Sequence, residues 1–206
     1  FPGDILKHAL PPHHRVRRKK IPKKPRKLKE FVATTPLYNE DKAIFKHTDA
    51  QKEAIQTICN ALDKKQFSPI LLHGITGSGK TEIYLKSIEH AIKHGLGALI
   101  LVPEIALTTQ LKARVEASFG HSVAIYHSGL TERERRDAWQ RIIDGRATIG
   151  LGARNAIFLP IQNLSLIVVD EEHDGAYKHD ATPYFNARDL AIVRAKYGQA
   201  VVILGS

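Results

Sequence analysis

The sequence contains no methionine, a single cysteine and no long run of apolar side chains. Because Cys59 has no second cysteine to join, neither an internal disulfide nor a cysteine zinc cluster can form. No stretch approaches the ~18 uncharged apolar residues that a membrane-spanning helix needs, so we expect no membrane contact. The eleven histidines show no metal-ligand spacing. Without a methionine or a signal-peptide pattern at Phe1, we expect a fragment or a processed form. The single cysteine fits a cytoplasmic setting.

The net charge of +10 is distributed very unevenly. Residues 1–30 hold eleven Lys and Arg against Asp4 and Glu30, so nine of the ten net charges lie there. Residues 13–40 read as a basic, proline-containing linker or arm, because prolines and dense charge oppose a packed core. Such arms often contact nucleic acid through its phosphates, although a solvated linker has the same composition. Asp4 to Leu10 could form a short structured segment ahead of the arm.

Residues 41–206 alternate helix and strand patterns. Several of the expected strands are apolar on both faces, which is typical of a parallel sheet covered by helices on both sides. The predicted fold is therefore an α/β P-loop NTPase (RecA-like) lobe with a mostly parallel sheet, preceded by the basic arm. The spacing predicts helices over 49–63, 81–94, 131–144 and 188–197, with another around 107–115. It predicts strands over 70–72, 98–102, 123–126, 147–151, 166–169 and 200–204.

The strongest motif follows the first expected strand and opens a helix. It matches G-x-x-x-x-G-K-[ST] at every fixed position, a pattern whose backbone N–H groups and helix N-terminus surround phosphates. Lys80 would neutralise the β- and γ-phosphates, and the Thr81 hydroxyl would bind Mg²⁺. A glycine-rich turn matching by chance is the alternative, which the strand–loop–helix context disfavours. The predicted nucleotide-binding residues of this loop are Gly74, Thr76, Gly77, Ser78, Gly79, Lys80 and Thr81.

An acidic segment follows the apolar strand at 166–169. At the carboxyl end of a parallel strand, where ligands bind in doubly wound sheets, Asp170 could hold Mg²⁺ through water. Glu171 is the candidate to orient or deprotonate attacking water, and His173 could link the nucleotide site to a bound polymer. A solvated acidic turn is the alternative. A phosphate-binding loop about 90 residues earlier favours the catalytic interpretation.

These motifs together resemble superfamily-two helicases, and further segments resemble the PriA family of replication-restart helicases within them. The resemblance covers about Thr48 to Ser206. The chain departs from the family pattern at Ala153 and Asn155 and in the loop around Pro183 and Asn186. The segments that carry the resemblance are Gly74–Glu82, Val102–Gln110, His127–Arg135 with Ala138-Trp139, Asp170–Asp174 with Tyr177-Lys178, and Ala187–Leu190.

The resemblance implies an ATP- and Mg²⁺-dependent 3′→5′ DNA helicase of the bacterial cytoplasm that restarts stalled forks by loading the primosome. Its implied partners are forked and single-stranded DNA, single-strand-binding protein and other primosome proteins. Residues 1–12 weakly resemble the end of the family's N-terminal DNA-binding domain. The family's zinc-binding cysteines are absent, so this chain has no expected zinc ligands. Without the family's second motor lobe, we expect the chain to bind nucleotide but not to unwind DNA.

Other residues have two interpretations each. Gln51 is placed to read adenine, or it completes a capping box with Thr48. Exposed aromatics after the acidic box could stack on bases, or their rings could pin the loop to the core. Arg188 could assist the coupling of DNA to that box, or form a salt bridge at a helix start. Trp139 is expected in the core. The predicted DNA-contacting residues are Pro103, Thr108, Gln110, Arg154, Tyr177, Lys178, Tyr184, Phe185 and Arg188.

Two other functions remain open at this point. An RNA helicase or restriction-type translocase would use the same lobe, although the segment from His127 to Trp139 disfavours it. A non-enzymatic nucleic-acid-binding module dominated by the basic arm would not need Lys80.

Overall fold

The computed structural model describes residues 47–75, 77–103 and 110–206. The predicted remnant (1–12) and basic arm (13–40) lie outside these residues, as do Thr76 and Thr108. Among the described residues, no helix has both the length and the apolar character to cross a membrane. The elements are α2 (Asp49–Lys64), β1 (Ser68–Leu72), α3 (Lys80–Lys93), β2 (Gly97–Leu101), α4 (Gln110–Phe119), β3 (Val123–Tyr126), α5 (Glu132–Ile143), β4 (Ile149–Gly152), η4 (Arg154–Phe158), β5 (Leu164–Val169), η5 (Gly175–Tyr177), β6 (Lys178–His179), β7 (Phe185–Asn186), α6 (Ala187–Gly198) and β8 (Val201–Gly205), with a 3₁₀ turn, η3 (Gly120–Ser122), before β3.

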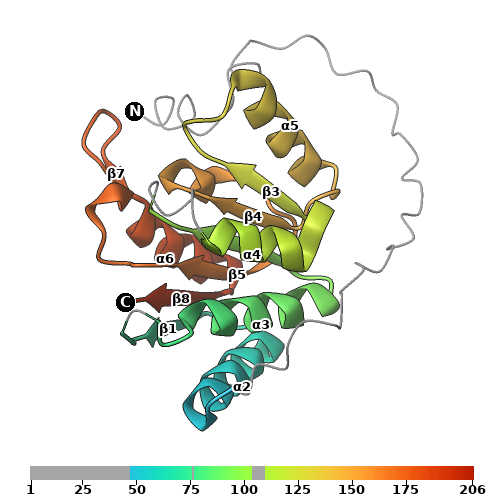
Figure 1. Cartoon of the computed structure of the whole chain (residues 1–206). Coiled ribbons are helices and arrows are strands. Elements are labelled where there is room, and N and C mark those ends of the chain that lie inside the picture. Colours follow the sequence, from blue (N-terminus) through green and yellow to red (C-terminus); the bar gives the residue numbers. More distant parts are fainter. Residues whose placement is uncertain (1–46, 76, 104–109) are drawn as a thin grey trace.

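Six strands form one parallel sheet in the order β1-β8-β5-β2-β4-β3 (Figure 1). The central strand β2 is buried along its whole length. Strands β6 and β7 form a separate antiparallel hairpin. The predicted parallel α/β sheet is confirmed.

Helices cover both faces of the sheet, which explains why its strands are apolar throughout. On β5, Leu166 and Val168 pack in the core beneath α2, α3 and α4. Ile167 and Val169 point to the opposite core, which is covered by α5 and α6. Successive strand residues face opposite sides, so a strand covered twice has no polar face.

Two capping boxes fix helix starts as the sequence predicts. Thr131 and Glu134 exchange side-chain and backbone hydrogen bonds at the start of α5. Trp139 on this helix is 4% exposed and lies 5.9 Å from the Tyr126 ring, so its predicted core role is confirmed. The strand predicted from Ala147 begins only at Ile149, because the Ala147 N–H donates to the Arg141 carbonyl and closes the turn after α5.

Candidate functional site

The loop between β1 and α3 is anchored at both ends by strand β8 and helix α2. The Ser206 N–H donates to the Leu72 carbonyl, and the Gly74 N–H donates to the Ser206 carbonyl. Gly77 and Gly79 have φ of 83° and 86°, a left-handed conformation that favours glycine. A Cβ on Gly79 would lie 2.4 Å from the Gln51 amide nitrogen. The backbone conformation favours glycine at both positions, and at Gly79 a side chain would also displace the Gln51 amide.

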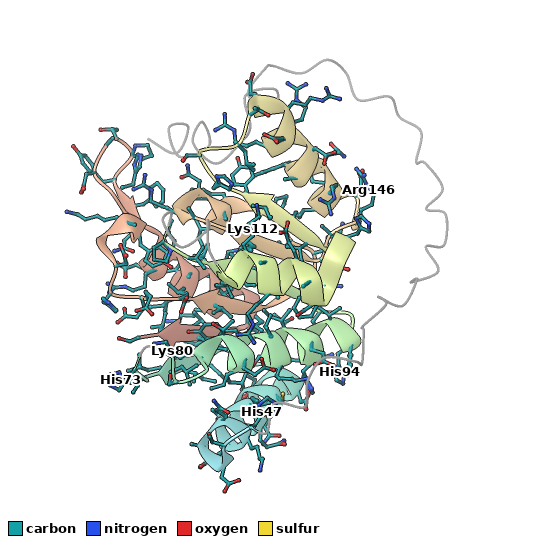
Figure 2. All side chains as sticks on the ribbon, viewed as in Figure 1. His47, His73, Lys80, His94, Lys112 and Arg146 are labelled. Atoms are coloured by element: carbon teal, nitrogen blue, oxygen red, sulfur yellow. The ribbon has the colours of Figure 1, made fainter. Side chains whose placement is uncertain are left out.

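Lys80 is the first residue of α3 and points back over the loop. Its Nζ donates to the Gly74 carbonyl at 2.7 Å and to the Ser206 main-chain oxygen at 3.1 Å, and its side chain is only 11% exposed. Figure 2 shows it at the end of α3 that lies nearest β1 and β8. An ammonium held by carbonyls at a helix N-terminus makes this loop a site suited to anions.

The acidic segment begins where β5 ends, beside the same loop. The Asp170 N–H donates to the Leu101 carbonyl, which continues the sheet by one residue. Its carboxylate accepts a 3.0 Å hydrogen bond from the Tyr84 hydroxyl of α3. Burial raises the pKa of Asp170, and the Tyr84 hydrogen bond opposes this. Burial, together with the Asp170 charge, also raises the pKa of Tyr84. The hydrogen bond offsets only part of the cost of burying the Asp170 charge. The carboxylate is therefore suited to bind a cation.

The two motifs meet in space, as the sequence predicts. Lys80 Nζ lies 3.6 Å from Glu171 Oε1. Glu171 has φ of 46°, which turns the chain sharply after Asp170. The carboxylates of Asp170 and Glu171 lie beside the loop, and Thr81 follows Lys80 on α3; oxygen donors of these types are the ligands that Mg²⁺ prefers. The cradle and the donor set therefore fit a Mg²⁺–phosphate group.

His173 occupies the exposed side of this acidic segment. Its Nδ1 lies 3.4 Å from the Ser206 hydroxyl, and its Nε2 lies 3.8 Å from Glu171 Oε2. His173 thus contacts both the acidic segment and the end of β8.

Gln51 forms the capping box and also contacts the phosphate loop. Its side-chain oxygen accepts from the Thr48 N–H, while the Thr48 hydroxyl accepts from the Gln51 N–H. Its Nε2 donates to the Ser78 carbonyl at 2.9 Å. The capping alternative is the one that the structure forms, and the amide ties α2 to the loop.

Tyr177 requires a correction to the prediction that it stacks on bases. It is 1% exposed, and its hydroxyl donates toward the carbonyls of Leu101 and Asp170, at 3.0 and 2.6 Å. A ring packed beneath these strand ends offers no face to a base. The alternative, in which the ring pins the loop to the core, is correct for Tyr177.

The β6–β7 hairpin carries the other predicted aromatic residues and projects on the side of the carboxyl strand ends (Figure 1). Tyr184 is 76% exposed, so its ring is open to solvent. Phe185 stacks on His179 and meets Phe158 edge-on, which fixes it to the body of the domain. Lys178 is exposed and pairs with Asp180 at 3.0 Å.

The two predicted arginines are engaged with protein groups. Arg154 donates to the carbonyls of Lys178 and Ala176, so it holds the hairpin. Arg188 bridges Glu172 and Asp189, the salt-bridge alternative. Pro103 is buried just after β2, and Gln110 is the first residue of α4.

Sequence reasoning missed Tyr84 and Gly205. A Cβ on Gly205 would lie 1.8 Å from the Tyr84 hydroxyl oxygen and 3.4 Å from Asp170 Oδ1. Tyr84 lies three residues after the phosphate-loop motif ends, and its partner Asp170 lies 86 residues away. Only the sheet order, with β8 next to β5, brings these three residues together.

Comparisons with known proteins agree with this arrangement. The chain is 46% identical over 159 residues to the replication restart protein PriA of Bacillus subtilis, covering 77% of this chain and 20% of that protein. It is 39% identical over 204 residues to PriA of Rickettsia felis, covering 99% and 29%. The chain therefore spans less than a third of the length of these curated relatives.

A solved structure and a family model complete the comparison. The structure of RecG bound to a three-way DNA junction matches with a TM-score of 0.61 at 25% identity, over 79% of this chain and 21% of that one. The fold is that of a RecA-like lobe of superfamily-two helicases. Residues 44–205 match the model described as "Type III restriction enzyme, res subunit". With its phosphate-binding loop and acidic strand end side by side, the chain belongs to this family.

Proposed function

We propose that this chain is the ATP-binding lobe of a bacterial, cytoplasmic 3′→5′ DNA helicase that restarts stalled replication forks by assembling the primosome. The observation that carries the proposal is the 3.6 Å approach of Lys80 to Glu171, which joins the phosphate loop to the acidic segment. The PriA relatives support the restart role, and RecG supports a branched DNA substrate.

Each residue at the loop has a proposed task. When bound, Mg–ATP supplies the γ-phosphoryl group whose hydrolysis drives the motor. The N–H groups of residues 74–81 and the Lys80 ammonium bind the phosphates, and Gln51 reads the base. Thr81 and Asp170 hold the metal. Glu171 orients the attacking water, and His173 transmits the change to the DNA side.

The DNA-contacting surface is proposed along the same edge of the sheet. Tyr184 and Lys178 are exposed on the hairpin and supply a stacking ring and a positive charge. Pro103, Thr108 and Gln110 follow β2 in the chain and are further proposed DNA contacts. Arg154, Phe185 and Arg188 position the hairpin and its neighbours. The arm at residues 13–40 adds phosphate contacts, and single-strand-binding protein and other primosome proteins are the proposed partners.

Tyr177, directly before β6, connects the hairpin to the nucleotide side. The Tyr177 hydroxyl contacts the carbonyl of Leu101 at the end of β2 and the carbonyl of Asp170 at the end of β5. A displacement of the hairpin by DNA would therefore move the Asp170 main chain. This supports DNA-stimulated hydrolysis in the longer protein.

Nucleotide binding by this chain tests the assignment of the loop. We expect Mg–ATP to bind, and Lys80→Ala to weaken hydrolysis by the longer protein by roughly 100-fold or more, since it removes the group that meets the transferred phosphate. Thermal unfolding serves as the control, because Lys80→Ala also removes the hydrogen bonds to the Gly74 and Ser206 carbonyls, so the variant must be shown to stay folded at the assay temperature. The chain by itself should hydrolyse ATP poorly and unwind nothing.

Substrate choice is tested separately by comparing forked DNA with duplex RNA. Preferential binding and unwinding of forked DNA is expected of the longer protein. Equal or better unwinding of RNA would replace the DNA assignment with an RNA helicase. Full activity of Lys80→Ala would favour a non-enzymatic binding module instead.

A further inference from the structure

The end of α3 remote from the phosphate loop carries a second polar cluster, which we call the α3-end cluster: Asp63, His90 and His94. Figure 2 shows Lys80 and His94 at opposite ends of this helix. One donor atom from each cluster residue lies within 4.8 Å of the other two. His90 Nε2 is 2.8 Å from Asp63 Oδ1, and the two histidine rings are 4.4 Å apart. The cluster joins the last turns of α2 and α3.

The spacing of the cluster on α3 is favourable for a metal. His90 and His94 are four residues apart, and two histidines at that spacing on one helix face form a common zinc-binding pair. This pair corrects the expectation that the histidines lack metal-ligand spacing, while the third residue, Asp63, is 27 residues from His90. The packing of α2 on α3 brings it there.

A hydrogen bond to the backbone orients the His94 ring. His94 Nδ1 lies 2.8 Å from the His90 carbonyl oxygen. A carbonyl can only accept, so Nδ1 carries the hydrogen of this contact, and Nε2 is the ring nitrogen left to face a metal. Such a backbone contact to the other ring nitrogen is the usual support of a histidine ligand.

We propose that Asp63, His90 and His94 bind one zinc-type divalent ion, with an open position for water. Two imidazoles and a carboxylate are the ligands of open zinc sites. Zinc–ligand bonds of about 2.0–2.1 Å place tetrahedral donors about 3.3 Å apart. Asp63 and His90 must therefore separate by about half an ångström. The Asp63 side chain is 56% exposed and is free to make this movement.

The ion would join α2 to α3 at their carboxyl ends. Helix α2 begins at the capping box in which Gln51 holds the Ser78 carbonyl of the phosphate loop. Clamping the other end of α2 would therefore stabilise the pair of helices that supports this loop. The proposed ion is distinct from Mg²⁺, which would bind at the opposite end of α3.

The test titrates zinc into the metal-free chain with a competing chromophoric chelator and measures thermal unfolding in parallel. We expect one zinc ion to bind with high preference over Mg²⁺. At about 100-fold excess over Kd, the Tm should rise roughly 5–10 °C. His94→Ala and Asp63→Asn should each weaken zinc binding at least tenfold and remove most of the Tm increase.

Matched controls identify the ligands. Cys59→Ser, one turn before Asp63, and His121→Ala, an exposed histidine elsewhere, should leave both measurements unchanged. Loss of binding in either control, or in a variant with His13 and His14 replaced by Ala, would overturn the assignment. So would full zinc affinity in His94→Ala. An ATP-binding measurement on Asp63→Asn should match the parent chain in the absence of zinc.

Discussion

The two ends of helix α3 carry polar clusters that differ in burial. At the start, Lys80 and Asp170 lie against the carboxyl edge of the sheet, and the Lys80 side chain is 11% exposed. At the other end, Asp63 and His94 are exposed, and only His90 is half-buried. Both clusters join residues that are distant in the sequence.

This difference in burial determines how strongly each cluster affects the stability of the fold. Buried charges are stable only with partners in good geometry, so the first cluster is crowded by Tyr84, Gly205 and main-chain groups. The exposed cluster is solvated without a metal and needs no such support. Mutations at the first end should therefore change stability strongly, and those at the second end only through a bound ion.

The largest effect is expected from Gly205→Ala. The new Cβ would lie 1.8 Å from the Tyr84 hydroxyl oxygen, so α3 or β8 must shift. We expect a loss of about 2–3 kcal/mol of unfolding free energy, or roughly 4–12 °C in Tm. Thermal unfolding measures it. Gly198→Ala is the matched control, since its Cβ meets nothing within 4 Å. Equal Tm values for the two variants would contradict the crowding.

Tyr84→Phe should have the next largest effect. It removes the hydrogen bond to Asp170 but leaves the buried ring in place. Losing a donor to a buried carboxylate should cost about 1–2 kcal/mol, and the Mg²⁺ concentration needed for ATP binding should rise. Chemical denaturation and nucleotide titration measure both. Tyr197→Phe, at a ring that is 86% exposed, is the control and should resemble the parent chain.

Asp170→Asn should change stability in the opposite direction. The raised pKa of Asp170 means that the folded state binds the proton more tightly, so ionisation at neutral pH disfavours folding. Replacing the carboxylate should raise Tm, while abolishing ATP hydrolysis by the longer protein. Stability of the parent falls as pH rises from the unfolded pKa through the folded one.

The pH dependence provides the check on this variant. The Tm advantage of Asp170→Asn should be greatest at pH 7 and should vanish only below pH ~3, well under the unfolded pKa of about 3.9, where the carboxyl is protonated in both states. A constant advantage at all pH values would show that packing, not charge, is responsible.

The smallest effect is expected from His94→Ala in zinc-free buffer. An exposed side chain at a helix end contributes within about 0.5 kcal/mol. Thermal unfolding in the presence of a chelator should therefore hardly distinguish this variant from the parent. A large metal-free loss would mean that the α3-end cluster is a structural hydrogen-bond network, and the comparison between the two ends would fail.

Much of the first cluster could be predicted because its motifs are local. The glycines and Lys80 read as a phosphate loop from spacing alone, and the apolar run before Asp170 predicts a buried strand. Tyr177 shows the limit of this reasoning. Its polar neighbours indicated an exposed ring, but its hydroxyl reaches two strand ends, and a buried tyrosine with both contacts satisfied is stable.

The sequence by itself determined the order of strands and helices, the parallel sheet and the two motifs, because periodicity, caps and glycine spacing act over a few residues. Only the tertiary structure decided which distant groups meet. The neighbouring positions of β8 and β5 place Gly205 between Tyr84 and Asp170, and the packing of α2 on α3 places Asp63 beside His90. These contacts depend on how faces and edges pack over long separations, which no local pattern encodes.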